Sequence, residues 1–169
     1  MTAPKIALAP LGRDGLDRVA HIAVHPEQEP FCGTIAGHFA ADEPDCDFHV
    51  VTRDGRAVGF FKIGRAYAAR FDFARPDELG LRGVMIDAAE QGRGTGKAAM
   101  RALGSYVAGL YPHAKALVLT VNEVNPVARA VYLDAGFVDT GAFHHGGRIG
   151  PQHILRLPLS TGPPGQPTS

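Results

Sequence analysis

A glycine-rich loop, QGRGTG from Gln91 to Gly96, restricts the fold of this chain more than any other segment. It lies between an apolar run at residues 79–86 and a stretch at 97–110 whose apolar residues recur at helical spacing. Glycines at three alternate positions let the main chain approach a ligand with no Cβ in the way. At a helix start, such a loop presents N–H groups and the positive end of the helix dipole, which favours a phosphate ligand. A plain glycine-rich turn without a ligand is the competing interpretation.

The segments around this loop predict a βαβ unit. Strands are expected at Leu79 to Ile86 and at Ala116 to Val121, with a helix at Lys97 to Leu110 between them. The apolar stripe of this helix consists of Ala99, Met100, Leu103, Tyr106, Val107 and Leu110. A second helix should begin at the cap residue Asn125 and end at Gly136.

The remaining elements are predicted from shorter patterns. The Asp54-Gly55 pair is typical of a hairpin turn between two β-rich runs, and Glu27 to Ala40 has apolar residues at helical spacing. The other expected elements are a strand at Lys5 to Leu8, hairpin strands at 47–52 and 57–64, a loop at 65–77, and closing strands at 137–143 and 153–159. The domain then covers residues 1–159, and the polar tail at 160–169 should be disordered.

Composition excludes several classes of function. A chain of 169 residues suits one domain, and its 17 Lys and Arg balance its 17 Asp and Glu, unlike the basic chain of a nucleic-acid binder. No apolar run approaches the roughly 18 residues of a membrane helix, and the first residues lack the layout of a signal peptide. Cys32 and Cys46 have no CxxC spacing, and His144, His145 and His153 have no acidic partner at ligand spacing. We therefore expect a cytoplasmic protein without a metal, a membrane or a nucleic-acid partner.

Three nucleotide-binding patterns compete for the loop. A P-loop requires a glycine where Gln91 stands and a hydroxyl where Ala98 stands, so that pattern fails at both ends. A dinucleotide fingerprint is met formally by Gly94, Gly96 and Ala99. It is the second choice, because too few elements follow the loop to build the other half of a dinucleotide fold. The third pattern is an acetyl-CoA loop.

Further residues agree with that third pattern, and the chain resembles the Gcn5-related N-acetyltransferase (GNAT) superfamily over about residues 79–142. The shared pattern is an apolar strand, a Gln/Arg-x-x-Gly-x-Gly/Ala loop, a helix, a strand, and then an Asn followed by a Tyr and by Gly-Phe. The residues that fall on it are Gln91, Gly94, Gly96, Asn125, Tyr132, Gly136 and Phe137. The resemblance implies a single α/β (α+β) domain with a mixed, mostly antiparallel sheet, helices on both faces and splayed central parallel strands.

The resemblance also implies acetyl-CoA as the co-substrate. Main-chain groups of Val84, Met85 and Ile86 would pair with its pantetheine arm, with the Ile86 N–H near the thioester oxygen. Asn125 would point into the same groove, although a helix cap explains this residue equally well. The pyrophosphate would lie on the loop that Gln91 begins and that continues with Gly92, Arg93, Gly94, Thr95, Gly96 and Lys97.

Tyr132 would be the general acid, because a phenol with a pKa of about 10 suits proton donation to a departing thiolate. A core aromatic is its alternative role. The general base is left open, since the position where many family members carry a Glu is Gly80 in this chain. A water chain could take this role, and the candidate side chains are Glu78, Asp87, Glu123 and His49.

The expected acceptor is a small cationic amine, such as a diamine or polyamine. Residues 19–52 contain no Lys or Arg but hold Glu27, Glu29, Asp42, Glu43, Asp45 and Asp47, which predicts an acidic wall or a solvated acidic face. The segments HPEQEPF and VMIDAAEQGRGTGKAAM are similar to the spermidine and spermine acetyltransferase branch of the superfamily. A protein N-terminus, an aminoglycoside and an amino acid stay open as acceptors. A non-catalytic acyl-CoA sensor is the alternative function, and a homodimer is one assembly that the sequence leaves open.

Overall fold

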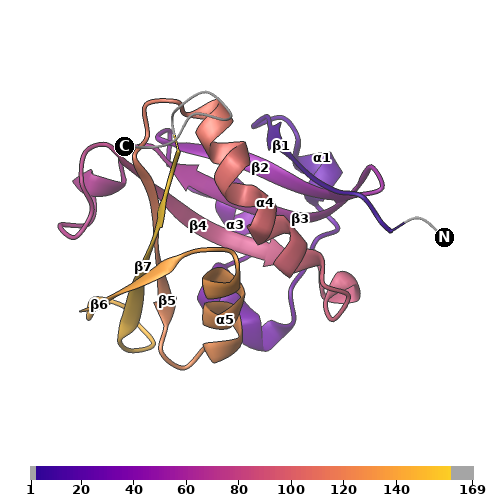
Figure 1. Ribbon diagram of the computed structural model, residues 1–169. Coiled ribbons are helices and arrows are strands. Elements are labelled where there is room, and N and C mark those ends of the chain that lie inside the picture. Colours follow the sequence, from indigo (N-terminus) through magenta and orange to yellow (C-terminus); the bar gives the residue numbers. More distant parts are fainter. Residues whose placement is uncertain (1–2, 161–169) are drawn as a thin grey trace.

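Seven strands form one mixed sheet in the order β1-β2-β3-β4-β5-β7-β6 (Figure 1). The computed structural model describes residues 3–160. The strands are β1 Ile6–Leu11, β2 Cys46–Arg53, β3 Arg56–Gly64, β4 Glu78–Ile86, β5 Ala116–Asn122, β6 Val138–His144 and β7 Gln152–Pro158. All neighbouring strands are antiparallel except β4 and β5, which run parallel. The expected mixed, mostly antiparallel sheet is confirmed. Of the tail predicted to be disordered, residues 161–169 lie outside the described residues.

Helices cover both faces of this sheet, as predicted. They are α1 Leu16–Val19, α2 Glu29–Cys32, α3 Ile35–Ala40, α4 Thr95–Leu110 and α5 Pro126–Asp134, with short 3-10 turns η1 Pro26–Gln28, η2 Tyr67–Ala69 and η3 Ala88–Glu90. Helices α4 and α5 pack on the face that is nearer in Figure 1, and α1 and α3 pack on the other face. No helix within residues 3–160 is long and apolar enough to cross a membrane.

The single helix expected at 27–40 is wrong, because the chain breaks there into η1, α2 and α3. Gly33 ends α2 with a φ of 76°, a left-handed conformation that glycine adopts without strain. Thr34 starts the next helix, since its hydroxyl accepts a hydrogen bond from the Gly37 N–H at 3.1 Å. The bend folds α3 back on α2, so that Nε2 of His38 lies 2.6 Å from the main-chain oxygen of Cys32.

Local turn and cap signals, in contrast, act as predicted. Asp54 and Gly55 have φ values of 50° and 85° and connect β2 to β3 in a tight hairpin. Asn125 caps α5, because its side chain accepts a hydrogen bond from the Ala128 N–H at 3.4 Å. Gly136 follows the helix with a φ of 105°, and the closing strands are β6 and β7.

The parallel pairing of β4 with β5 is short. It joins Glu78–Gly80 to Ala116–Val118. Beyond Gly80 and Val118, the described residues of β4 and β5 form no further strand pair with each other. On its other side, β4 stays paired with β3 as far as Ile86, apart from a register shift near Gly83, where φ is 62°. The two central strands therefore splay apart beyond Gly80, as predicted.

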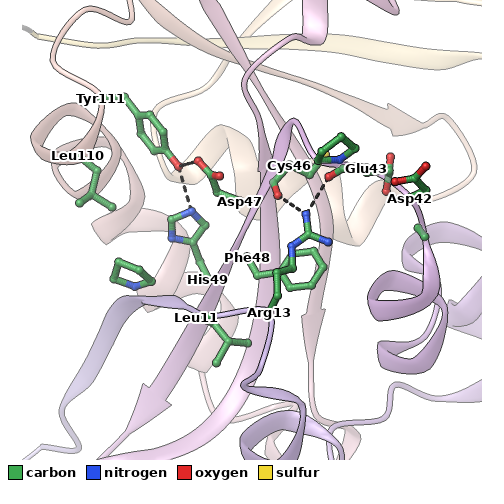
Figure 2. A pocket seen from close by; sticks show the side chains of 14 residues that line it. Leu11, Arg13, Asp42, Glu43, Cys46, Asp47, Phe48, His49, Leu110 and Tyr111 are labelled. Atoms are coloured by element: carbon green, nitrogen blue, oxygen red, sulfur yellow. Dashed lines mark hydrogen bonds between the residues drawn. The ribbon is translucent and has the colours of Figure 1, made fainter.

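A hydrogen-bonded chain fixes the C-terminal end of α4 to β2. Figure 2 shows the Tyr111 hydroxyl next to Asp47 and His49 in a hollow at this end of the sheet. The hydroxyl donates to Asp47 at 2.7 Å and so accepts from Nε2 of His49 at 3.2 Å, while Nδ1 accepts from the Tyr106 hydroxyl at 2.6 Å. Burial lowers the pKa of His49 to about 4, and the ring is therefore neutral. Leu110, expected in the apolar stripe of α4, is instead 45% exposed beside this hollow.

The contact between the Tyr67 ring and Gly80, where the parallel pairing of β4 ends, can be tested by mutation. A Cβ at Gly80 would overlap the ring of Tyr67, so we expect Gly80→Ala to lower the free energy of unfolding by about 1 to 3 kcal/mol. Gly109→Ala is the matched control, because Gly109 lies in α4 with open space around its Cβ position. The control should gain about 0.5 to 1 kcal/mol. Urea unfolding measures both changes, and a fully stable Gly80→Ala variant would contradict this packing.

Candidate active site

A cleft of about 790 Å³ opens where β4 and β5 separate. One wall is formed by the end of β4, the glycine loop and the first turn of α4. The opposite wall comes from the end of β5 and from α5, and residues of η1, α2 and α3 close one side. The cleft is thus built around the gap that the splayed strands leave in the sheet.

The free edge of β4 faces this cleft. The Asp87 N–H donates to the Val58 oxygen at 2.9 Å, which makes these two residues a hydrogen-bonded antiparallel pair. Because such pairing alternates along a strand, Met85 also directs its main-chain groups to β3, whereas Val84 and Ile86 direct theirs towards β5. The chain therefore presents an unpaired strand edge, which an extended ligand can complete by adding main-chain-like hydrogen bonds.

The glycine loop provides the second binding surface of the cleft. Gly92 and Gly94 have φ values of 81° and 79°, and nothing lies within 4 Å of a Cβ placed at either position. Gly94 is the N-cap of α4, and the first intrahelical bond runs from the Ala98 N–H to the Gly94 oxygen at 3.0 Å. The N–H groups of the preceding helical residues have no partner in the helix and point out of its positive end. This geometry suits a phosphate group.

Polar side chains from β5 and α5 face the same cleft. Tyr132 is half-buried beside Phe137, with ring centroids 5.6 Å apart, and its hydroxyl forms no hydrogen bond with residues 3–160. Burial raises the pKa of this phenol, and the nearby Cys32 raises it further. The Asn122 side-chain oxygen is buried in the cleft with no hydrogen-bond partner in the described part of the chain. Both side chains are therefore free to bind a ligand.

Comparison with known proteins agrees with this geometry. Residues 16–137 match the acetyltransferase (GNAT) family. The chain belongs to this family. An uncharacterised N-acetyltransferase of Bacillus subtilis (strain 168), YbbJ, is 32% identical over 107 residues, which are 63% of this chain. The match spans 66% of that relative, just under two thirds of its length.

Solved structures with different acceptors share the fold. An aminoglycoside acetyltransferase in complex with coenzyme A has a TM-score of 0.73 and 15% identity, with 91% of this chain and 95% of that chain covered. A spermidine N-acetyltransferase chimera, built from the Vibrio cholerae protein SpeG and hSSAT, has a TM-score of 0.64 and 15% identity, with 90% of this chain and 95% of that chain covered. At these identities the likeness shows the GNAT fold alone.

The structure brings most of the predicted site residues together in the GNAT cleft. The residues that line it are Val84, Ile86, Gln91, Gly92, Gly94, Thr95, Gly96, Lys97, Asn125 and Tyr132. Met85 does not, because its side chain is 1% exposed in the core on the other face of the sheet. Arg93 also lies outside the lining, with its guanidinium 3.7 Å from the Glu90 carboxylate. The sequence could not separate these two from their neighbours, since adjacent residues of a strand or loop face different ways.

Gln91 has a structural role that its place in the motif does not reveal. Its side-chain nitrogen donates to the Ile86 oxygen at 2.9 Å and to the side-chain oxygen of Gln28, also at 2.9 Å. The Gln28 amide donates back to the Gln91 oxygen at 3.1 Å. This reciprocal amide pair ties the glycine loop to η1, which helps to close one side of the cleft.

None of the four side chains considered as a general base lines the cleft. Glu78 is buried and accepts hydrogen bonds from Arg156 at 2.6 and 3.0 Å, so its carboxylate is occupied. His49 belongs to the chain of hydrogen bonds in Figure 2, away from the cleft. Asp87 accepts from the Ala23 N–H at 3.3 Å, and Glu123 lies outside the lining. Within residues 3–160, His, Cys, Asp and Glu form no cluster suited to a metal ion.

The cleft also contains polar residues that the sequence did not single out, among them Gln28, His38, Lys62, Tyr67, Arg82, Glu90 and Asn122. They come from separate segments, and no local pattern joins them. Lys62 is 3% exposed and lies 2.6 Å from the Glu43 carboxylate, which Arg82 contacts as well. Burial favours the neutral carboxyl, but these two cations outweigh it and hold the pKa of Glu43 at about 2.

The acidic segment at 19–52 is not the open acidic wall that its composition suggests. Glu43 is paired with Lys62 and Arg82, and Asp45 lies 3.5 Å from Arg70. Asp47 lies 3.2 Å from Arg65. Three of the six acidic residues are therefore paired with cations from β3, β4 and the loop between them, and of the six Glu27 alone lines the cleft.

The Glu43 cluster gives the GNAT domain a predictable response to acid. Because folding lowers the pKa of Glu43 from 4.5 to about 2, its contribution is complete above pH 4.5 and is lost as the pH falls towards 2. We expect Glu43→Gln to reduce the free energy of unfolding by about 2 to 3 kcal/mol at pH 7. The difference from the parent should shrink as acid protonates the parent. Unfolding measured across this range tests it, and a constant difference would contradict the ion-pair cluster.

Proposed function

We propose that this protein is an N-acetyltransferase that moves an acetyl group from acetyl-CoA directly to a small primary amine. The observation that carries the proposal is the coincidence of three features in one cleft. These are the free edge of β4, the open glycine loop at the start of α4, and the Tyr132 hydroxyl, which has no hydrogen-bond partner among residues 3–160. Family membership supports the reaction class.

The donor groups of the cleft fit the parts of acetyl-CoA. The N–H groups at Gly94 and the first turn of α4 suit the pyrophosphate. The main-chain groups of Val84 and the N–H of Ile86 suit the amides of the pantetheine arm, which adds to β4 as a further strand would. The unpartnered oxygen of Asn122 is a buried acceptor that an amide N–H of this arm could satisfy.

In this proposal the reaction is a direct attack of the amine on the thioester. The amine nitrogen bonds to the acetyl carbon, the carbon–sulfur bond breaks, and the sulfur takes a proton from Tyr132. Its raised pKa keeps the phenol protonated at working pH, so it is available as a donor. A main-chain N–H of Val84 or Ile86 stabilises the negative charge that develops on the thioester oxygen.

For the acceptor we propose a small cationic amine, with diamines and polyamines as the first class to test. Glu27 is an exposed carboxylate at the cleft wall and can attract such a cation. The aromatic rings of Tyr67 and Phe71, 4.7 Å apart, provide apolar surface in the same cleft for the methylene groups of the amine.

The test is release of free coenzyme A thiol from acetyl-CoA in the presence of an amine panel. The panel contains a monoamine, a diamine, a polyamine, an aminoglycoside, an amino acid and a peptide. We expect turnover with a cationic amine, and Glu27→Gln should raise the KM of a polyamine several-fold more than that of a monoamine. Glu29→Gln is the matched control, because Glu29 is also exposed but does not line the cleft.

Two results would contradict these proposals. Equal effects of Glu27→Gln and Glu29→Gln would remove the role of Glu27 in acceptor binding. Binding of acetyl-CoA without thiol release for any amine would favour the alternative function, a non-catalytic acyl-CoA sensor. Gly94→Asp serves as the negative control for the donor site, since it places a side chain and a negative charge at the helix start.

Tyr132→Phe tests the general acid. The substitution keeps the ring and its contact with Phe137 and removes only the hydroxyl, so affinity for acetyl-CoA should be unchanged. We expect kcat to fall by about 10²- to 10⁴-fold, the range for loss of a general acid. Steady-state kinetics and calorimetric titration give the two values. An unchanged kcat would make Tyr132 a packing residue.

A further inference from the structure

The candidate bases considered from the sequence all lie outside the cleft, but one histidine lies within it. His38 comes from α3, and its ring stacks on Phe60 with centroids 5.3 Å apart and planes at 25°. Two glycines with positive φ, Gly33 and Gly83, lie against the Nε2–Cε1 edge of the ring. A Cβ at Gly33 would lie 3.1 Å from Nε2, and one at Gly83 would lie 2.9 Å from Nε2 and 2.8 Å from Cε1. The imidazole therefore rests on the irregular part of β4, next to Val84.

The hydrogen bond of this ring defines its tautomer. Nε2 lies 2.6 Å from the main-chain oxygen of Cys32, and a carbonyl oxygen can only accept. Nε2 therefore carries the hydrogen, and Nδ1 keeps its lone pair. Within residues 3–160, Nδ1 has no hydrogen-bond partner and is therefore a free proton acceptor. The two carboxylates among the residues that line the cleft are Glu90, which lies 4.0 Å from Arg53 and 3.7 Å from Arg93, and the exposed Glu27.

Burial and nearby cations keep His38 neutral. Burial lowers its pKa, and Lys62 of β3 and Arg82 of β4 lower it further. The hydrogen bond to the Cys32 oxygen and the carboxylate of Glu43, from the loop after α3, act in the opposite direction, and the net shift is downward. The remaining titratable neighbour is Cys32 of α2, whose thiol is neutral because burial raises its pKa to about 11. At neutral pH the ring is therefore an unprotonated base.

We propose that His38 is the general base of the acetyl transfer and takes a proton from the acceptor ammonium on Nδ1. This inference rests on the proposed function and names a catalytic residue for it. Cys32 lies between the two proton-handling groups, because its oxygen binds His38 and its thiol lies near Tyr132. Acid and base are thus both neighbours of Cys32 in the lining of the cleft.

The protons balance in this scheme. Nδ1 takes the first proton from the ammonium and passes it to solvent. The neutral nitrogen then bonds to the acetyl carbon, the carbon–sulfur bond breaks, and the sulfur takes the hydroxyl proton of Tyr132. The second proton lost by the nitrogen restores the Tyr132 hydroxyl, so one proton is released for each amide formed.

A base is needed for a strongly basic amine but not for an amine that is already neutral. We therefore compare a primary alkylamine that the panel identifies as an acceptor with its β-trifluorinated analogue, which is unprotonated at the assay pH. His38→Gln keeps a donor for the Cys32 oxygen and removes the base. We expect kcat/KM to fall by about 100-fold for the alkylamine and by less than about 5-fold for the fluorinated amine.

His21→Gln is the matched control. His21 also contacts a main-chain oxygen, that of Ala57 at 2.8 Å, but it lies outside the cleft, so both rates should match the parent. If His38→Gln does not fold, His38→Asn takes its place with the same expectation. Equal losses with both amines would show a packing role and overturn the proposal, as would no loss with either.

A second measurement is independent of any acceptor. Long-range ¹⁵N–¹H correlation spectra of the parent protein should show His38 as the Nε2–H tautomer at neutral pH, with an unprotonated Nδ1. An Nδ1–H tautomer or a protonated ring would overturn the proposal even if the panel finds no acceptor. Absence of turnover in the parent would instead count against the proposed function, so the two failures are distinguishable.

Discussion

The main-chain hydrogen bonds that β4 does not make with β5 determine the architecture of this protein. Three residues of each strand pair, and beyond Gly80 the two strands separate inside a continuous sheet. A buried strand edge is costly unless another group satisfies it. Here the unpaired edge, the start of α4 and the end of β5 enclose the same space. The binding site therefore lies where the hydrogen-bonded pairing of β4 with β5 is incomplete.

Long-range polar contacts hold the side of this cleft that the short helices form. Glu43 follows α3, and its partners Lys62 and Arg82 are 19 and 39 residues further along the chain. Removing one member of such a buried cluster leaves the others without a counter-charge, which costs more than the pair itself contributes. The cluster thus fixes the region of α3, and with it His38, against β3 and β4.

The predictions that the structure confirms rest on signals within a few residues. The Asp54-Gly55 turn, the Asn125 cap and the glycine loop each specify their own backbone conformation, and the βαβ unit follows from regular periodicity. The expected helix at 27–40 failed for a local reason as well, because Gly33 adopts a left-handed φ inside an apolar pattern that favours a helix.

The remaining residues of the site could not be predicted from the spacing of residues along the sequence. His38 reaches the cleft through the bend at Gly33 and the irregular pairing at Gly83, which are fifty residues apart in the sequence. The acidic segment looked unbalanced because the cations that pair with Glu43, Asp45 and Asp47 lie in other elements. Tyr132 illustrates the same limit. Its motif gives the position of the residue, but only the fold shows that it lines the cleft and that its hydroxyl has no hydrogen-bond partner in the described part of the chain.

The reciprocal amide pair of Gln28 and Gln91 restricts which substitutions these two positions can accept during evolution. Each amide satisfies the other, and Gln91 also holds the Ile86 oxygen. A change at one position leaves a polar group of the other without its partner, whereas a matched change at both can keep the contact. The two positions should therefore covary among close relatives, and grafting the η1 segment from one relative into another should succeed only when the glycine loop travels with it.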